Sequence, residues 1–312
     1  MKVLRDLEKF DENIKSIVTV GTFDGLHLGH LSILEALKRI SKDVKGTTVL
    51  VTFEPHPRTV VSKNYELKML LSFEEKEKLL NSFGIEHLIV ITFTDKFANL
   101  TSDEFIKEYI VGKFNAVHMV VGHDHKFGKD RLGDEQKLKD VGETLNFTVT
   151  SVPAETVDGE IISSTIIRNS LLNGNVEKAN QFLGRYYSFS GIIVKGAQRG
   201  RTLGFPTANL KLDFEKKVIP KKGVYLVKCE CESEIRFGIM NIGYRPTFEE
   251  RSELVIETHL LNFDRDIYGK RMNIQFLNRL RDEKKFGSMD ELIHQIEDDK
   301  KRAIELINIL VN

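Results

Sequence analysis

Two histidines in a glycine-rich stretch are the side chains of this sequence best suited to chemistry. His27 and His30 belong to the segment 21–30 (GTFDGLHLGH), which follows the apolar run 17–20 and precedes a pattern typical of an amphipathic helix. Glycines let the backbone turn tightly and approach a ligand, and a helix N-terminus offers N–H groups and the positive end of its dipole. Imidazoles placed there can donate hydrogen bonds to a phosphate while pyrophosphate leaves. The segment therefore predicts a nucleotide-phosphate site.

The spacing His-x-Gly-His resembles the signature of the nucleotidyltransferase superfamily, whose members move AMP or CMP from a nucleoside triphosphate onto an acceptor. Such a transfer needs no strong base if the attacking group is already a phosphate. The alternative is a loop shaped by Gly25 and Gly29 with histidines at the surface. That alternative leaves two histidines at a helix N-terminus unexplained.

Two further loops follow predicted strands and suit a flat ligand. The segment 52–57 (TFEPHP) leaves its strand through two prolines, which fix an extended loop that carries an aromatic ring and an imidazole. The segment 121–128 (VGHDHKFG) leaves a later strand with glycines that permit close approach. Because ligands of open parallel sheets bind at the carboxyl ends of the strands, we expect His27, Pro55 and His123 to converge.

The segment 163–168 (SSTIIR) places hydroxyls at a predicted helix N-terminus and a guanidinium one turn into that helix. This arrangement could cradle the β- and γ-phosphates of a nucleotide. The alternative is an ordinary helix cap followed by a solvated arginine.

The second half of the chain contains a glycine- and arginine-rich motif at 195–209 (KGAQRGRTLGFPTAN). A flexible backbone can close over phosphates, arginines can neutralise them, and a hydroxyl and an amide oxygen held by Pro206 can face a hard cation. The motif is not a Walker A sequence, since no Gly-x-x-x-x-Gly-Lys-Ser/Thr occurs. The alternative is a basic hairpin turn.

Glu257 is a carboxylate within the apolar strand pattern 255–260 (VIETHL). Phosphorylating a neutral hydroxyl requires a base, and an uncompensated buried charge is costly enough to require a reason. Strand alternation alone would instead turn Glu257 towards solvent.

The elements that must position these residues change character along the chain. The first half alternates β-branched runs with helical patterns, which predicts βαβ units and a parallel sheet. The expected strands are 17–20, 47–53, 88–93, 117–121 and 147–152. Helical periodicity follows residue 30, capping boxes at 72–75 and 101–104 begin two more helices, Gly84 suits a helix end, and 163–173 forms another helix.

After residue 185 the pattern changes to alternating strands, which predicts an antiparallel barrel or sandwich. The expected strands are 189–194, 224–230, 235–241, 254–261 and 272–277. A capping box at 288–291 begins a long amphipathic helix that runs through Leu310. We place the domain boundary near residue 185.

Bulk properties restrict the possible partners. A chain of 312 residues is long for one domain, and 46 acidic against 46 basic residues argue against a nucleic-acid or anionic-membrane footprint. The charged segment 1–13 and the lack of a long apolar run predict a cytoplasmic protein without a membrane partner. Cys229 and Cys231 lie two apart in a strand pattern and are expected to be structural thiols.

In this order, the motifs resemble those of the bacterial bifunctional riboflavin kinase and FAD synthetase family, over essentially the whole chain. The resemblance implies a Rossmann-like α/β nucleotidyltransferase domain at 1–185 and an antiparallel riboflavin kinase β-barrel with a C-terminal helix at 186–312. One position departs from the family pattern, because His125 stands where an aromatic ring is usual.

The resemblance also implies roles for individual residues, which we group by substrate. The implied catalytic residues are Glu257, His27, His30 and Arg168. The implied ATP-binding residues are Gly21, Phe23, Asp24, Gly29, Asp124, Ser164, Thr165, Gly196, Arg201, Gly204, Thr207 and Asn209. The implied flavin-binding residues are Pro55, His56, Pro57, Phe127, Arg281 and Phe286. Thr207 and Asn209 would also hold Mg²⁺.

The resemblance implies two successive reactions, in which ATP phosphorylates riboflavin to FMN and a second ATP adenylylates FMN to FAD. One alternative is a different His-x-Gly-His transferase with an unrelated barrel, against which the motif at 195–209 argues. Another is a flavin-binding or storage module that has lost turnover. Oligomeric state is left open by the sequence.

Overall fold

The computed structural model describes residues 1–6, 10–11, 13–62, 66–196, 206–246 and 252–311. Over the described residues, contacts divide the chain into two compact units, Met1–Ser164 and Thr165–Asn312. This division by contacts falls earlier than the boundary near residue 185, which was drawn from the change of pattern. A boundary by activity near residue 185 stays a prediction.

The first unit contains a parallel sheet, for which the described residues supply six strands in the order β1-β4-β3-β2-β5-β6. Its strands are β1 (Lys2–Arg5), β2 (Ser16–Val20), β3 (Thr47–Glu54), β4 (His87–Thr92), β5 (Ala116–Gly122) and β6 (Thr148–Val152). All five expected strands are confirmed. The sequence analysis missed β1, because two apolar residues between charges give too little alternation to indicate a strand.

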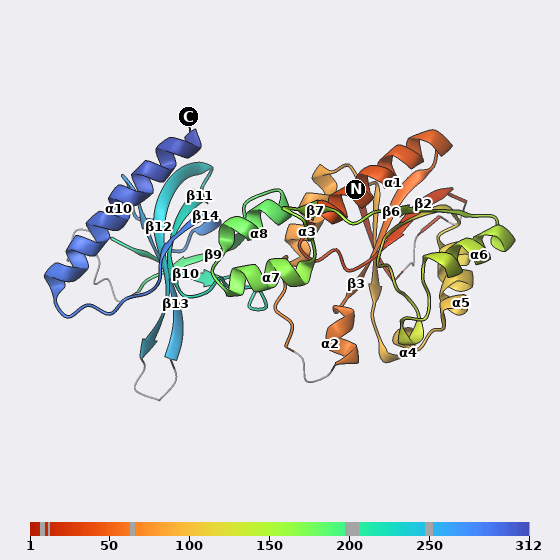
Figure 1. The fold of residues 1–312 in the computed structure, drawn as a ribbon, viewed down its shortest axis with the longest axis horizontal. Coiled ribbons are helices and arrows are strands. Elements are labelled where there is room, and N and C mark those ends of the chain that lie inside the picture. The colour runs from red at the N-terminus through yellow and green to blue at the C-terminus, as the bar shows by residue number, and fades with distance from the viewer. Residues whose placement is uncertain (7–9, 12, 63–65, 197–205, 247–251, 312) are drawn as a thin grey trace. The chain divides into compact units, whose positions relative to one another are not determined.

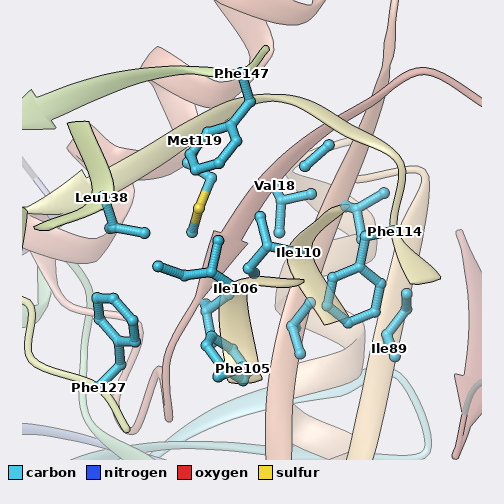
Figure 2. Close-up of a cluster of buried hydrophobic side chains, with 14 of the residues drawn as sticks. Val18, Ile89, Phe105, Ile106, Ile110, Phe114, Met119, Phe127, Leu138 and Phe147 are labelled. Carbon is cyan, nitrogen blue, oxygen red and sulfur yellow. The ribbon is translucent and has the colours of Figure 1, made fainter. Parts of the chain in front are cut away.

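Both faces of this sheet are covered, as buried parallel sheets require. Ile17 belongs to a cluster with the helix residues Leu34 and Leu37, whereas its neighbour Val18 belongs to a second cluster with Phe105 and Ile106. Successive residues of a strand point to opposite faces, so one strand serves both layers. Figure 2 shows the second cluster, in which the aromatic rings come largely from segments that follow β4 and β5.

Helices on the two faces connect these strands (Figure 1). They are α1 (Leu28–Val44), α2 (Pro57–Val61), α3 (Phe73–Ser82), α4 (Asp95–Ala98), α5 (Ser102–Glu104), the π-helix η1 (Phe105–Lys113), the 3₁₀ turn η2 (Lys129–Arg131) and α6 (Glu135–Leu145). A short hairpin of β7 (Thr156–Val157) and β8 (Glu160–Ile161) follows β6. Both expected capping boxes are confirmed, at Ser72 with Glu75 and at Thr101 with Glu104.

Helices α7 (Ser164–Leu172) and α8 (Val176–Leu183) lead into the second unit, and α7 confirms the helix expected at 163–173. The Asn180 side-chain amide of α8 donates to the Phe276 carbonyl oxygen at 2.9 Å, and its oxygen accepts from the Tyr187 N–H at 2.7 Å. These bonds attach α8 to strand β14 (Arg271–Arg281) and to the segment that precedes β9 (Ser188–Val194).

The second unit is a closed antiparallel barrel, for which the described residues supply strands in the order β10-β13-β12-β11-β14-β9. Its strands are β9 (Ser188–Val194), β10 (Ala208–Leu212), β11 (Gly223–Cys231), β12 (Glu234–Pro246), β13 (Ser252–Leu260) and β14 (Arg271–Arg281). All five expected strands are confirmed. The sequence analysis missed β10, because it begins inside the Pro-Thr-Ala-Asn part of the motif at 195–209.

Side chains that pair across neighbouring strands fill the interior of the barrel. Tyr225, Met240 and Thr258 pair in succession and are fully buried. Cys229 also lies on β11 and is buried, and burial raises the pKa of its thiol, which fits the expected structural role. The opposite face of these strands therefore forms the outside of the barrel.

Helix α10 (Met289–Val311) covers part of that outside, where Ala303 packs with Val224, Leu226 and Ile239. The Ser288 hydroxyl accepts from the Glu291 N–H at 3.3 Å, while Glu291 accepts from the Gly287 N–H at 3.0 Å. One bond of the expected capping box is thus present, whereas Glu291 accepts from Gly287 rather than from Ser288. Along the part of the chain that the structure describes, no helix is both long and apolar enough to cross a membrane.

Candidate active sites

The topology brings three of the polar loops to one edge of the parallel sheet. Strand β2 lies between β3 and β5, and all three run in the same direction. The loops that begin after Val20, Glu54 and Gly122 therefore leave the sheet at the same end. This arrangement places the loops of His27, Pro55 and His123 at the same edge of the sheet, and the convergence of their side chains stays a prediction.

The two histidines of the first motif stack at the N-terminus of α1. Their ring centroids lie 3.7 Å apart, and the rings are inclined by 18°. His27 is the N-cap residue, and its Nδ1 accepts from the His30 N–H at 3.4 Å. Because Nδ1 acts as the acceptor, a neutral His27 carries its proton on Nε2, where it can donate to an anion. The positive end of the dipole of a 17-residue helix favours an anion at the same place.

The turn before His27 has an unusual backbone. Phe23 and Leu26 have φ values of 48° and 41°, and Gly25 has a φ of 90°. Residues other than glycine rarely adopt this left-handed region. The backbone of the turn is therefore strained and persists only because neighbouring groups restrain it. Phe23 is 2% exposed, and its ring lies 4.9 Å from the His30 ring. Phe23 thus packs against the His30 ring.

Asp24 belongs to this turn, and its buried carboxylate is bound by backbone N–H groups of the protein. It is 1% exposed, and its Oδ1 accepts from the N–H groups of Leu70 at 2.9 Å and Leu71 at 3.2 Å. The Ser164 hydroxyl donates to the Asp24 carbonyl oxygen at 2.8 Å. The structure therefore favours an indirect role for Asp24, in which it shapes the turn.

Gly29 and Gly21 leave space around the rings of this site. A Cβ on Gly29 would lie 3.4 Å from both Cε1 and Nδ1 of His27, and one on Gly21 would lie 3.1 Å from the Phe23 ring. Glu155, which the sequence analysis missed, accepts from the Ser32 hydroxyl of α1 at 2.7 Å. Nothing in its local sequence marked Glu155, because it lies in the loop after β6 and reaches α1 only in the folded chain.

The loop after β3 is held as the prolines predicted. His56 is the N-cap of α2, and its Nδ1 accepts from the Arg58 N–H at 3.1 Å. Pro55 is exposed, whereas Pro57 begins α2 and is partly buried. These residues form an open, rigid rim at the sheet edge.

The loop after β5 contains the position that departs from the family pattern. The His125 ring stacks on Phe127, with centroids 5.6 Å apart. Phe127 itself packs into the core and lies 5.7 Å from the Phe105 ring. Asp124, the preceding residue, is largely exposed. His125 therefore still places a ring at this position, stacked on Phe127.

Thr165 and Arg168 belong to the second contact unit and lie in the first two turns of α7. Thr165 is exposed and Arg168 is buried. Their expected contact with nucleotide phosphates stays a prediction.

On the barrel, Glu257 lies between two asparagines. In the β-sheet register it pairs with Asn209 of β10 on one side and with Asn241 of β12 on the other. Directly opposed residues of neighbouring strands share a face, with Cβ atoms about 5 Å apart. This is the outer face, so alternation does turn Glu257 outwards, but it remains partly buried beside Asn209. The resemblance places the segment that begins at Asn241 near the nucleotide and flavin, but the pairing of Asn241 with Glu257 depends on strand register and has no local sequence signal.

The segment that contains Thr207 is tied to the strand of Glu257. The His259 Nδ1 lies 2.9 Å from the Pro206 carbonyl oxygen and donates to it. Burial lowers the pKa of His259, and the bond to Pro206 opposes that effect. His259 therefore holds the beginning of β10 against β13. Arg201 and Gly204 lie outside the described residues.

Gly196 leaves the space that the Asn209 side chain occupies. A Cβ built on Gly196 would lie 2.0 Å from Asn209 Nδ2 and 2.9 Å from Oδ1. Hydroxyl and amide oxygens are donors that suit Mg²⁺, and Thr207 and Asn209 supply one of each kind. The donor set thus fits a hard cation.

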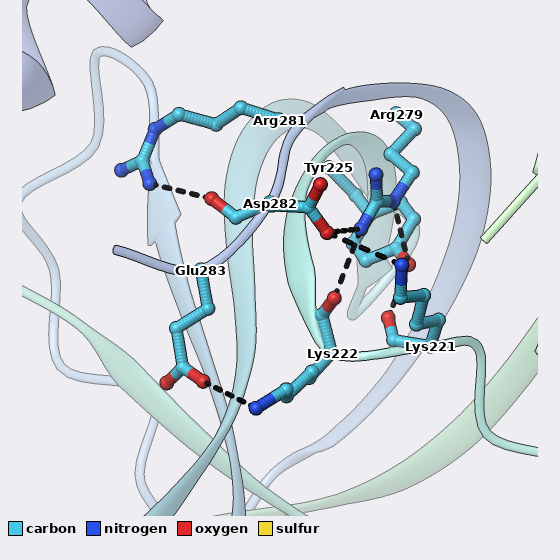
Figure 3. Close-up of polar contacts among 7 residues, drawn as sticks. All are labelled: Lys221, Lys222, Tyr225, Arg279, Arg281, Asp282 and Glu283. Atoms are coloured by element: carbon cyan, nitrogen blue, oxygen red, sulfur yellow. Dashed lines mark hydrogen bonds and ion pairs between the residues drawn. The ribbon is translucent and has the colours of Figure 1, made fainter. Parts of the chain in front are cut away.

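Arg281 is the last residue of β14, and Phe286 lies in the segment that follows. Figure 3 shows the polar contacts of Arg281, Asp282 and Glu283 at this end of the strand. Arg281 binds Asp299 of α10, with both carboxylate oxygens within 3.1 Å, and its guanidinium lies 5.8 Å from the Phe286 ring. Asp282 accepts from Arg279 at 2.8 Å and lies 3.4 Å from the Lys221 ammonium. These cations hold the pKa of Asp282 below its usual range, mainly through the Arg279 hydrogen bond.

Comparisons with known proteins match both units. The family model described as FAD synthetase matches residues 9–166, and the one described as riboflavin kinase matches residues 183–307. A bifunctional riboflavin kinase/FMN adenylyltransferase from Bacillus subtilis is 39% identical over 305 residues, covering 96% of this chain and 95% of that protein. Its counterpart from Escherichia coli K12 is 33% identical over 313 residues, covering 99% of each chain.

Among solved structures, a protein from Streptococcus pneumoniae named a macrolide-efflux protein has a TM-score of 0.88 and 32% identity to this chain. The match covers 96% of this chain and 97% of that one. Its name describes that protein alone, and the match shows a shared fold. Because both family models match in order and the curated relatives align over nearly the whole length, the chain belongs to the bifunctional riboflavin kinase/FMN adenylyltransferase family.

Proposed function

We propose that the chain makes FAD from riboflavin in two steps, each at one of the two sites described above. In the first, ATP phosphorylates the 5′-hydroxyl of riboflavin to give FMN and ADP. In the second, the FMN phosphate attacks the α-phosphorus of another ATP to give FAD and pyrophosphate. The observation that carries this proposal is the match to both family models in one chain. We assign adenylyl transfer to residues 1–185 and the kinase reaction to residues 186–312.

In the kinase reaction, Glu257 takes the proton of the riboflavin hydroxyl as that oxygen attacks the γ-phosphorus. Its place between Asn209 and Asn241 supports this role, because neighbouring amides can orient a carboxylate. Thr207 and Asn209 would hold Mg²⁺, which when bound neutralises charge on the transferred phosphoryl group. His259 holds the Pro206 carbonyl and so fixes the beginning of β10.

In the adenylyl transfer, His27 and His30 donate hydrogen bonds to phosphate oxygens as negative charge grows on the departing pyrophosphate. The stacked geometry at the N-terminus of α1 supports this role. Arg168, Ser164 and Thr165 would bind the β- and γ-phosphates. Pro55, His56, Pro57 and Phe127 would border the flavin ring, and Asp124 the adenosine.

The proposal is tested by incubating the pure protein with riboflavin, ATP and Mg²⁺ and separating the flavins by chromatography over time. FMN is expected first and FAD later, with ADP and pyrophosphate released. Stoichiometric uptake of flavin without either release would instead indicate a storage module. Cell fractionation tests the further expectation that the protein is cytoplasmic.

Replacing Gly29 by alanine is expected to impair FAD formation while leaving the fold intact. The new methyl group makes an ordinary 3.4 Å contact with the His27 ring but occupies space beside the imidazole that a phosphate would approach. A loss of about 1.4–2.8 kcal/mol of binding to the displaced phosphate corresponds to a loss of about 10- to 100-fold in kcat/KM for ATP. Steady-state pyrophosphate release measures it, with thermal unfolding as the control. A wild-type KM for ATP would contradict the assignment.

Replacing Gly196 by alanine is expected to impair FMN formation and to increase its Mg²⁺ requirement. The Cβ would lie 2.0 Å from Asn209 Nδ2, so the amide must move from its position. Displacing such a supporting contact typically costs about 10- to 100-fold in metal affinity or activity. Initial rates of FMN formation over a range of Mg²⁺ concentrations measure the effect. An unchanged Mg²⁺ dependence would remove Asn209 from the metal site.

A further inference from the structure

Lys76 is a buried cation that the two reactions do not use directly. It lies on α3, is 6% exposed, and its Nζ donates to the Thr22 carbonyl oxygen at 2.7 Å. Nζ also lies 3.4 Å from the Thr52 Oγ1, which itself donates to the Thr22 carbonyl at 3.3 Å. Burying an ammonium costs several kcal/mol, so an apolar side chain of similar length would be the cheaper way to fill this space.

The charges near Lys76 compensate part of this cost. Burial lowers the pKa of Lys76, whereas the carboxylates of Asp24, in the turn, and Glu54, at the end of β3, act in the opposite direction. Asp24 is also buried, and its carboxylate accepts two backbone N–H groups. The buried Asp24 carboxylate in the turn therefore favours the charged form of Lys76.

The backbone atom that Lys76 holds begins the strained part of this turn. Thr22 directly precedes Phe23, whose φ is 48°, and the Phe23 ring lies 4.9 Å from His30. A left-handed residue persists only where its neighbours fix it, at a cost of about 1–3 kcal/mol. A donor on the Thr22 carbonyl restrains the peptide that leads into Phe23. A chain of contacts thus links Lys76 to His30 through the Thr22 carbonyl and the Phe23 ring.

We infer that Lys76 is a positioning residue for adenylyl transfer, whose ammonium fixes the Thr22–Phe23 peptide and thereby the ring of His30. This inference rests on the proposed function of the first site. Lys76 touches neither substrate, so its loss should act on the rate of the step that His30 assists. Substrate affinity should change little.

The test compares Lys76→Met, which removes the donor and the charge, with Lys76→Gln, which keeps an N–H donor. Lys78→Met, an exposed position on the same helix, is the matched control. Full-length proteins are assayed for FAD formation from FMN, for FMN formation from riboflavin, and for thermal unfolding. A wild-type protein that makes no FAD from FMN would refute the function, independently of Lys76.

The Met variant is expected to lose about 10- to 100-fold in kcat for FAD formation, the cost of misplacing a catalytic group by roughly 1 Å. Its KM values for ATP and FMN should stay within a factor of about three, and FMN formation should be unchanged. The Gln variant should recover a substantial part of kcat, and Lys78→Met should behave as wild type.

Four results would overturn the inference. They are an unchanged kcat in the Met variant, an effect confined to KM, equal impairment of the Met and Gln variants, and failure of the Met variant to fold at low temperature. The last would make Lys76 a residue of stability alone. A merely structural role also predicts that the rate and the unfolding temperature fall together. The inference instead expects a reduced kcat at temperatures where the variant is still folded.

Discussion

Replacing His30 by alanine is expected to abolish FAD formation while FMN formation continues at the wild-type rate. The His30 ring stacks on His27 at 3.7 Å and lies in the first turn of α1, where pyrophosphate would depart. Removing one donor aimed at developing negative charge typically costs about 10²- to 10³-fold in rate. The kinase site is a separate set of residues on the barrel, so its rate should not respond.

The measurement is a time course of FMN and FAD from riboflavin, with pyrophosphate release followed separately. His294→Ala is the matched control, because this histidine is largely exposed on α10. Phe23 supports the lost ring and is buried, so thermal unfolding should accompany the assay. FAD synthesis within a few-fold of wild type would count against His30 as a catalytic residue.

Replacing Glu257 by glutamine is expected to do the reverse, stopping FMN formation while FAD is still made from added FMN. Glutamine keeps the size of the side chain but replaces one acceptor oxygen by an NH₂ donor, and it cannot accept the hydroxyl proton. General bases typically contribute about 10²- to 10⁴-fold, so a loss of that size is expected in kcat for riboflavin phosphorylation. Glu257→Ala should lose at least as much.

ADP release with riboflavin as acceptor measures this effect, and Glu230→Gln is the control, an exposed carboxylate on β11. FAD formation from FMN in the same preparation shows that the protein is folded. Undiminished FMN production in the Gln variant would remove Glu257 as the base. The register with Asn209 would then indicate a structural role.

The sequence predicted most strands of both units, because β-branched runs and alternation are local signals. It did not predict two strands whose local signal is too short or is hidden within another motif. Strand β1 (Lys2–Arg5) is recognisable only by its pairing with β4, and β10 (Ala208–Leu212) begins within a ligand-binding motif. The sequence also did not decide between a closed barrel and a sandwich, since alternation is the same in both.

The candidate sites were predictable in residue type but not in orientation. Asp24 resembled a ligand contact in the motif, yet its carboxylate binds the N–H groups of Leu70 and Leu71, far along the chain. The support of the turn by Lys76 has the same long-range origin. Such contacts depend on where α3 packs against the sheet, and a single sequence contains no local signal for that packing.

The two units differ in whether their sheets have edge strands, and this affects how copies of the chain could associate. The barrel of described strands closes on itself, whereas the open sheet terminates in β1 and β6. Unpaired strand edges invite intermolecular pairing, and natural proteins guard them with short length and charge. Strand β1 has only four residues and carries exposed Lys2 and Arg5 at its ends. Aggregation of a partly folded chain should therefore begin in the N-terminal sheet, with β6 as the more vulnerable edge.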